Sequence, residues 1–299
     1  MDFKVSSHGK LLITAEYYVL KGAKSFAIPT KFKQDLEFKY NASNKLKWIS
    51  LDSHNQVWIE ALFDLNNISI ISDKNKHSLN LQKILRSARN INSEFLQKNQ
   101  GGEVTTSLNF ETNWGLGTSS TLINNIALWA KIDPYELLWN NFKGSGYDIA
   151  CANSEKPLIY KLINNKPNVK QVKFNPNFKD HLFFVYLNKK QDSNVEVDTF
   201  SNLKIDESLV RKISELTTRF INAKNLEDFQ KCISEHELII SKTIGKELIQ
   251  RKYFNDYNGK IKSLGAWGGD FILAAGPLNS KDYFSKKGFS TIFNYKEIF

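Results

Sequence analysis

The spacing of apolar residues along the first third of the chain predicts mainly β structure. Residues 31–40 alternate apolar and polar positions, which is typical of a strand with one buried face. Residues 10–20 form an almost continuous apolar run and are predicted to be a buried strand, and shorter apolar runs lie at 57–62 and 68–71. The amino-terminal third is therefore expected to consist mostly of strands.

The apolar period changes after residue 78. From Leu81 to Phe95 apolar side chains recur every three or four residues, which predicts a helix, and the glycines within 100–102 supply a stop signal. Residues 103–110 alternate again, as a strand does. They lead into the stretch NWGLGTSSTLINNIALWA at 113–130, where glycine and hydroxyl residues precede another helical pattern. The predicted local order is strand, glycine loop, helix.

The second half of the chain mixes both kinds of element. We predict two strands, at 157–162 and 181–187, which are separated by a loop rich in Asn, Pro and Lys. Two amphipathic helices are predicted at 207–222 and 226–250, and a last strand and a short helix follow them. Mixed runs of this kind predict an α+β protein. A length of 299 residues suits two domains, for which we expect the bounds 1–178 and 179–299.

Composition narrows the classes to which the chain can belong. With 41% hydrophobic and 24% charged residues it is ordinary for a globular protein, and it has no apolar run of the roughly 18 residues that a membrane span needs. The amino terminus lacks the apolar stretch of a secretory signal, so we expect a cytoplasmic protein. Two distant cysteines and five histidines without paired helical spacing predict neither a disulfide framework nor a dedicated metal cage.

The formal net charge of +10 raises the question of an anionic partner. The lysines are spread along the chain, no block of five or six like charges occurs, and basic patches with interleaved aromatic residues are absent. No nucleic-acid or membrane partner is therefore expected. The charge gives only slight support to a small anionic ligand.

The glycine loop GLGTSS at 115–120 has two interpretations. Glycines let the backbone adopt positive φ and approach a ligand closely, and the first-turn amides of the following helix attract an anion such as phosphate. Alternatively Thr118, Ser119 or Ser120 only caps the helix, which is the commoner role of such residues. P-loop and Gly-x-Gly-x-x-Gly spacings are absent, as are protein-kinase signatures, so the standard nucleotide folds are not predicted.

Three other segments accompany this loop, namely SSHGKLLITAEYYVLKGAKSFAIPT at 6–30, GSGYDIACA at 144–152 and KSLGAWGGDFILA at 262–274. In this order the four segments resemble the GHMP kinases, the superfamily of galactokinase, homoserine kinase, mevalonate kinase and phosphomevalonate kinase. The resemblance covers nearly the whole chain. It implies a two-domain α+β fold, with an amino-terminal unit like the second domain of ribosomal protein S5 and a ferredoxin-like carboxy-terminal unit.

The resemblance implies a site for ATP and magnesium. In these kinases a Gly-Leu-Gly-Ser-Ser stretch wraps the ATP phosphates, and the matching loop here consists of Gly115, Leu116, Gly117, Thr118, Ser119 and the adjoining Ser120. Ser119 takes the position of the hydroxyl that reaches the metal. The implied cofactors are therefore ATP and Mg²⁺.

The resemblance also implies the catalytic residues Asp148 and Lys10. Asp148 in GSGYD matches the aspartate beside the substrate hydroxyl, where a carboxylate can accept the proton of the attacking alcohol. Lys10 in HGK matches the lysine of the family's Pro-Gly-Lys motif, although His8 replaces the proline, and its charge would keep the carboxylate ionised. A helix-cap aspartate and a solvated lysine are the ordinary alternatives.

Residues on the substrate side follow from the same resemblance. Glu16 matches a family glutamate and either shapes the substrate pocket or pairs with a nearby cation. Gly265, Ala266 and Gly268 belong to the third glycine stretch, which in the family packs against the active site. There Trp267 replaces a glycine, and it either walls the pocket or packs into the core.

Three further residues are matched less directly. Glu136 stands where mevalonate kinases draw a second magnesium ligand, but Asp-Pro-Tyr-Glu at 133–136 also indicates a helix start with a capping box, which we favour. Lys189 and Ser193 resemble a segment near the substrate in phosphomevalonate-type members.

The expected function is that of an ATP- and magnesium-dependent kinase whose partners are ATP and a small molecule. Mevalonate is the first choice and phosphomevalonate the second, because GAWGGD ends in an acid as in phosphomevalonate kinases but no basic cluster is evident for a second phosphate. A decarboxylase is not expected, since GSGYDIACA does not resemble that branch. A non-catalytic ligand sensor stays an alternative, and so does a homodimer.

Overall fold

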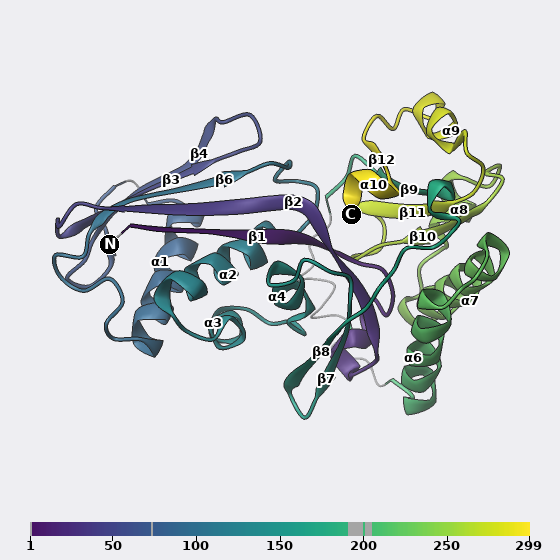
Figure 1. Ribbon diagram of the computed structural model, residues 1–299, viewed down its shortest axis with the longest axis horizontal. Coiled ribbons are helices and arrows are strands. Elements are labelled where there is room, and N and C mark those ends of the chain that lie inside the picture. Colours follow the sequence, from purple (N-terminus) through teal and green to yellow (C-terminus); the bar gives the residue numbers. More distant parts are fainter. Residues whose placement is uncertain (1, 73, 191–199, 201–204) are drawn as a thin grey trace. The chain divides into compact units, whose positions relative to one another are not determined.

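The computed structural model describes residues 2–72, 74–190, 200 and 205–299, and the chain divides into two units (Figure 1). The first unit contains Met1–Gly9, Phe32–Thr112 and Leu116–Asn153, and the second contains Lys10–Lys31, Asn113–Gly115 and Ser154–Phe299. Two strands, β1 (Phe3–Leu12) and β2 (Ser25–Tyr40), run from one unit into the other. The bounds 1–178 and 179–299 stay a prediction about folding domains.

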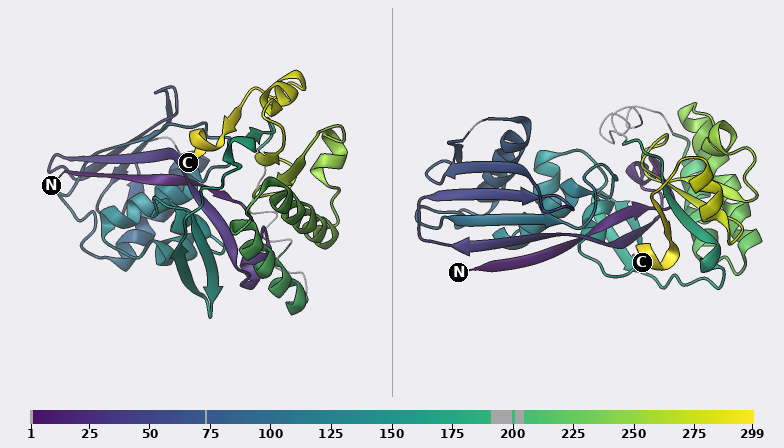
Figure 2. Two further views of the ribbon diagram at one scale, coloured as in Figure 1. Left: turned by 45° about the vertical axis from the view of Figure 1, so that its right-hand side comes forward. Right: turned by 90° about the horizontal axis from the view of Figure 1, so that it is seen from above.

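The first unit is a sheet that carries helices on one face. Its strands have the order β5-β4-β3-β6-β2, β1 also pairs with β2, and β3 pairs with β6 in parallel. Figure 1 and the right-hand view of Figure 2 show α1 to α4 together on one side of these strands. The further elements are β3 (Lys45–Leu51), β4 (Val57–Asp64), β5 (Ser69–Ile70), α1 (Lys76–Ile91), β6 (Gly102–Leu108), α2 (Thr118–Ala130), α3 (Pro134–Asn141) and α4 (Tyr147–Ala152).

The core of the first unit follows from the two side-chain periods. Alternate residues of the strands, such as Leu36, Phe38 and Trp48, are buried against residues that recur at helical spacing, such as Leu85 and Ile126. One apolar layer therefore holds α1, α2 and α3 on the sheet, and it fixes the start of α2, where the glycine loop ends.

The second unit contains an antiparallel sheet of order β10-β11-β9-β12 and a hairpin of β7 and β8, with β7 paired to the start of β2. Helices α6 and α7 pack against each other. The elements are η1 (Tyr18–Lys21), β7 (Leu158–Ile163), β8 (Lys166–Gln171), η2 (Lys179–His181), β9 (Leu182–Tyr186), α6 (Glu207–Ile221), α7 (Leu226–Ile244), α8 (Ile249–Tyr253), β10 (Lys260–Ser263), β11 (Phe271–Ala275), α9 (Ser280–Lys286), β12 (Ile292–Asn294) and α10 (Tyr295–Ile298). No helix in the described part of the chain is long and apolar enough to cross a membrane.

The α+β prediction is confirmed, but two element predictions in the first half were wrong. The buried run at 10–20 is not one strand, because β1 ends at Leu12, Ala15 and Tyr17 take positive φ, and a short 3₁₀ helix follows. The helix that begins before Leu81 ends at Ile91 rather than at the glycines of 100–102. Apolar burial continues past both ends, which is why the apolar pattern alone misplaced them.

Two predictions in the second half were also wrong. The Asn-rich loop after β7 contains strand β8, and Asn164 and Asn165 both take positive φ in the tight turn between the two strands. Asparagine tolerates that conformation, so the dipeptide is a hairpin signal. The helix predicted over 226–250 ends at Gly245, which adopts the left-handed C-cap conformation, and α8 follows as a separate helix.

Candidate active site

The glycine loop ends at the amino terminus of α2, in the first unit. Gly117 occupies the N-cap with φ 92°, and it has no side chain to accept hydrogen bonds from the first-turn amides. The Ser120 hydroxyl donates to the Gly117 carbonyl over 2.9 Å instead of capping an amide, while Ser119 is exposed. Amides without a side-chain cap, next to an exposed hydroxyl, suit an anion such as phosphate.

Gly115 begins the same loop but lies in the second unit, beside Asp270. Its φ is 69°, and a Cβ at this position would overlap the Asp270 carboxyl group, so only glycine fits. The ammonium group of Lys10 donates to the Gly115 carbonyl over 2.9 Å. The second unit thus brings together Lys10 and Gly115, two of the predicted residues, and adds a carboxylate beside them.

Asp148 lies in the first turn of α4, after Gly146, which occupies the N-cap with φ 87°. Helix α4 packs against α2, so neighbouring helices of the first unit carry the predicted aspartate and the end of the predicted phosphate loop. Tyr135 of α3 belongs to the same surroundings. Burial, and after it the neighbouring Cys151, Asp148 and Asp133, raise the pKa of its phenol. The phenol therefore stays protonated near Asp148 and can donate a hydrogen bond.

Glu136 lies in the first turn of α3 and is exposed. The helix start predicted here is confirmed, with Pro134 as its first residue. The cap is formed by Asp133, which accepts from the Tyr135 N–H over 2.7 Å, rather than by a reciprocal pair with Glu136. No three Asp, Glu, His or Cys side chains gather as a metal cluster within the residues that the structure describes. Magnesium binding by Ser119 or Glu136 therefore stays a prediction.

The third glycine stretch forms a turn between β10 and β11 of the second unit. Gly265 and Gly268 take positive φ and are partly exposed, whereas Ala266 is buried. Trp267 is 2% exposed and packs with Tyr17 and other apolar residues of the second unit, and its backbone N–H donates to the Tyr17 hydroxyl over 3.0 Å. Of the two alternatives for Trp267, the structure shows the core residue.

The segment after β9 supports the end of this stretch. The Asp270 N–H donates to the carbonyl of Lys189 over 2.7 Å, and the Asp270 carbonyl accepts from Leu187 over 2.8 Å. The backbone of Lys189 therefore holds Asp270 in place. Ser193 lies outside the described residues.

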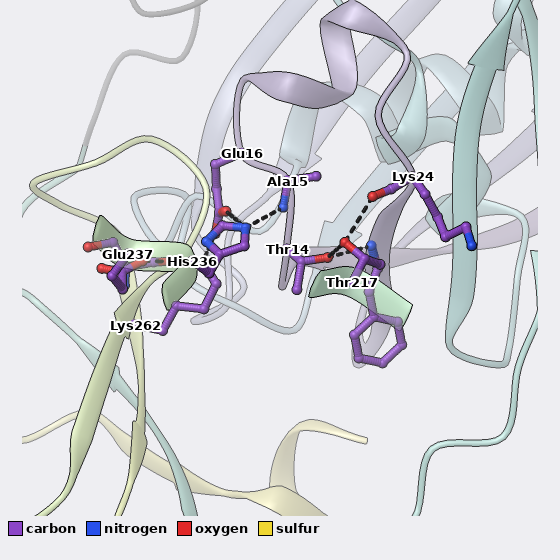
Figure 3. Close-up of polar contacts among 10 residues, drawn as sticks. Thr14, Ala15, Glu16, Lys24, Thr217, His236, Glu237 and Lys262 are labelled. Carbon is purple, nitrogen blue, oxygen red and sulfur yellow. Dashed lines mark hydrogen bonds and ion pairs between the residues drawn. The ribbon is translucent and has the colours of Figure 1, made fainter. Parts of the chain in front are cut away.

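Glu16 is fully buried in the second unit and pairs with Lys262 of β10 (Figure 3). The Lys262 ammonium group donates to Glu16 Oε1, lies 3.4 Å from Glu237 Oε1, and donates to the Ser263 carbonyl over 3.0 Å. Glu237 Oε2 in turn accepts from the Ser263 N–H over 3.1 Å. Pairing with a cation, one of the two alternatives for Glu16, is thus the observed one. With no exposed surface, Glu16 cannot itself contact a ligand.

His236 of α7 completes this buried cluster. Its Nε2 accepts from the Ala15 N–H over 2.9 Å and lies 3.5 Å from Glu16 Oε2. Because Nε2 accepts from Ala15, it carries no proton and cannot donate to Glu16. Burial, opposed by the charge of Lys262, raises the pKa of Glu16 to about 7. Burial and Lys262 lower the pKa of His236, so the imidazole is neutral.

The raised pKa of Glu16 predicts a pH dependence of stability. Between its ordinary value of 4.5 and about 7 the unfolded chain ionises Glu16 while the folded chain does not, so Glu16 lowers the free energy of unfolding as the pH rises. The variant Glu16→Gln lacks this loss. Its free energy of unfolding minus that of the parent should therefore be about 2–3 kcal/mol larger at pH 8 than at pH 5. Urea denaturation at both pH values measures it.

A matched control separates this effect from general pH sensitivity. His236 acts in the opposite sense, because its buried ring is neutral and the folded protein loses stability as the pH falls. His236, Lys262 and Glu237 are present in both the variant and the parent, so their effects cancel in the difference. The exposed Glu207→Gln should show no such trend. Parallel pH profiles for Glu16→Gln and the parent would contradict a protonated Glu16.

Comparison with solved structures identifies the fold. Over 98% of this chain and 98% of that one, it resembles the mevalonate kinase of Methanococcus jannaschii, with 16% identity and a TM-score of 0.69. A phosphomevalonate kinase from Streptococcus pneumoniae, in complex with phosphomevalonate and AMPPNP, matches with 15% identity, 98% and 99% coverage and a TM-score of 0.72. A Lactococcus lactis galactokinase, complexed with galactose, matches with 14% identity, 98% and 92% coverage and a TM-score of 0.65. The chain has the GHMP kinase fold. No family model and no curated protein sequence matches it.

The structure also places three residues beside the predicted ones that the sequence did not single out as site residues. Asp270 beside Gly115 had a signal, the acid that ends the third glycine stretch. Tyr135 near Asp148 and Lys262 beside Glu16 had none, because a lone tyrosine in a helix and a lone lysine in a strand are usually at the surface.

Proposed function

We propose that this protein is an ATP-dependent kinase that transfers the γ-phosphoryl group to an isoprenoid precursor, with mevalonate as the first choice. One observation carries the proposal. The chain has the fold of three small-molecule kinases. The predicted phosphate loop leads into α2, Asp148 lies on α4, and these two helices pack together. Similarity at this identity supports the fold, and the residues at these positions support the chemistry.

The phosphates of ATP are proposed to bind at residues 115–120. Gly117 at the N-cap leaves the first-turn amides of α2 without a side-chain acceptor, and positive φ at Gly115 lets the backbone approach an anion. Mg²⁺ would be held by the Ser119 hydroxyl together with phosphate oxygens, with Glu136 as a second candidate, and it would neutralise charge on the phosphates. A metal held largely by the nucleotide needs no preformed acidic cluster.

Phosphoryl transfer then assigns roles to Asp148 and Lys10. An oxygen of the substrate attacks the γ-phosphorus, the bond from that phosphorus to the ADP oxygen breaks, and the alcohol proton passes to the Asp148 carboxylate. Lys10 contributes positive charge while it holds the Gly115 carbonyl. Gly265, Ala266 and Gly268 are proposed to lie on the substrate side, and Glu16 to support them through Lys262 and Ser263.

Phosphomevalonate is the alternative substrate. The S. pneumoniae neighbour was solved with phosphomevalonate and an ATP analogue, and Asp270 ends the third glycine stretch here. A non-catalytic sensor of the same fold is the alternative without turnover. The proposal includes neither a nucleic-acid nor a membrane partner, and a cytoplasmic location and a homodimer stay predictions.

A substrate panel tests the proposal. Purified protein is incubated with ATP and magnesium and, separately, with mevalonate, phosphomevalonate, homoserine and galactose, and release of ADP is followed. We expect substrate-dependent turnover with mevalonate or phosphomevalonate. Turnover with a sugar or homoserine alone would keep the kinase and overturn the isoprenoid substrate. ATP binding without any turnover would favour the sensor, and neither binding nor turnover would overturn the proposal.

A further inference from the structure

A chain of buried amide and hydroxyl groups crosses the first unit beneath α2. The side chains of Ser7, Asn124 and Asn125 are completely buried. Asn125 Nδ2 donates to the Gln34 carbonyl over 2.9 Å, and the Ser7 hydroxyl donates to Asn125 Oδ1 over 2.6 Å. Asn124 Nδ2 donates both to Ser7 Oγ over 2.8 Å and to Asn153 Oδ1 over 3.2 Å. The chain thus joins β2, β1 and α2 to the residue that ends α4.

The direction of every bond in this chain is fixed by one backbone carbonyl. The Gln34 carbonyl can only accept, so Asn125 must turn its NH₂ group towards it and its Oδ1 towards Ser7. The Ser7 hydroxyl has one proton, which it donates to Asn125 Oδ1. Towards Asn124 it can therefore only accept, so Asn124 must turn its NH₂ group to Ser7 Oγ. That same NH₂ group therefore faces Asn153, which must present Oδ1. No other orientation of Asn124 satisfies its neighbours.

Helix α4 depends on such contacts because it is short. It has six residues, from Tyr147 to Ala152, and isolated helices of that length are not stable in water. Asn153 is its C-cap and is exposed, so its contact with the buried Asn124 ties the free end of α4 to α2. Asp148 lies five residues before Asn153, in the first turn of the same helix.

We propose that Asn124 is a positioning residue, which through Asn153 holds α4, and with it Asp148, in place against α2. The inference rests on the proposed function, because it gives Asn124 a role in phosphoryl transfer without contact with the substrate. Displacing a reacting group by about 1 Å can cost about 10²-fold in rate. Loss of the amide contact should therefore lower kcat, while the KM for ATP, set at the start of α2, stays nearly unchanged.

The exposed end of the contact offers a matched pair of variants. Asn153→Asp keeps an oxygen that accepts from Asn124, and Asn153→Ala removes it, at a position where neither change disturbs the core. We expect kcat of Asn153→Ala to fall about tenfold, with the KM for ATP within about twofold of the parent. Asn153→Asp should lose clearly less, because it keeps the acceptor and only adds a mildly unfavourable charge at the carboxy terminus of α4. Asn124→Ala should lower kcat by about 10²-fold. Equal kcat for the parent and Asn153→Ala, or equal losses in Asn153→Ala and Asn153→Asp, would overturn the proposal.

A readout independent of turnover separates this proposal from the proposed function. Amide hydrogen exchange of residues 147–152 should quicken clearly more in Asn153→Ala than in Asn153→Asp, while exchange in α1 stays the same in all three proteins. If the parent turns over no substrate, the proposed function fails. Faster exchange confined to 147–152 would then still support the anchoring of α4 by Asn124, and unchanged exchange would overturn it.

Discussion

Asp148→Asn is expected to lower kcat by about 10²–10⁴-fold, the usual contribution of a general base. Asparagine has nearly the same shape but cannot accept the proton of the substrate alcohol. Asp148 lies in the first turn of α4 rather than in the phosphate loop, so the affinity for ATP should be largely kept. Steady-state kinetics with the substrate found by the panel, together with titration of ATP binding, measure both effects.

The matched control is Asp282→Asn. Asp282 also lies in the first turn of a short helix, α9, so this variant loses the same favourable interaction with a helix amino terminus. Its kcat should equal that of the parent. If Asp148→Asn keeps more than about a tenth of the parental kcat, Asp148 is not the base, because general bases contribute more than that. Equal losses in the two variants would point to helix stability instead.

Trp267→Ala should destabilise the protein by about 3–5 kcal/mol, the usual result of removing a large aromatic residue from a core. Trp267 is 2% exposed and packs with Tyr17 and Phe200 in the second unit. The substitution deletes this packing and leaves a cavity beneath the third glycine stretch. Urea denaturation followed by circular dichroism measures the change in the free energy of unfolding.

Tyr253→Ala serves as the aromatic control, since Tyr253 is 51% exposed and its loss should change the free energy of unfolding by less than about 1 kcal/mol. The competing role of Trp267, as a wall of the substrate pocket, makes a different prediction. In that case Trp267→Ala would leave stability nearly unchanged and raise the KM for the substrate. That result would contradict a core role for Trp267.

Much of the fold was predictable where one side-chain period determines the structure. In β2 alternate residues from Gln34 to Phe38 are buried, and in α6 the buried residues recur at helical spacing, so local pattern and final environment agree. The start of α3 was predictable because its signals are local: Asp133 caps the helix and Pro134 is its first residue. The four glycine-bearing segments predicted the fold because they match the GHMP kinases in order as well as in composition, while the site residues stay a prediction.

The remainder depends on partners that are distant in the sequence. Glu16 and Lys262 are 246 residues apart, and the predicted burial of residues 10–20 does not indicate which cation pairs with Glu16. The burial of Trp267 depends on Tyr17, which comes from the other end of the second unit's sequence. The orientation of Asn124 is set by a carbonyl of β2 through two intervening side chains. Local propensity carries no information about contacts of this kind.

The close approach of Gly115 and Asp270 has a consequence for how this sequence can change over time. The carboxyl group occupies the space where a side chain at 115 would begin, and the positive φ at 115 disfavours a side chain even where residue 270 is small. Relatives that share this arrangement should therefore keep glycine at 115, whereas position 270 is free to vary as long as 115 stays glycine. An alignment would test this independently of any measurement of activity.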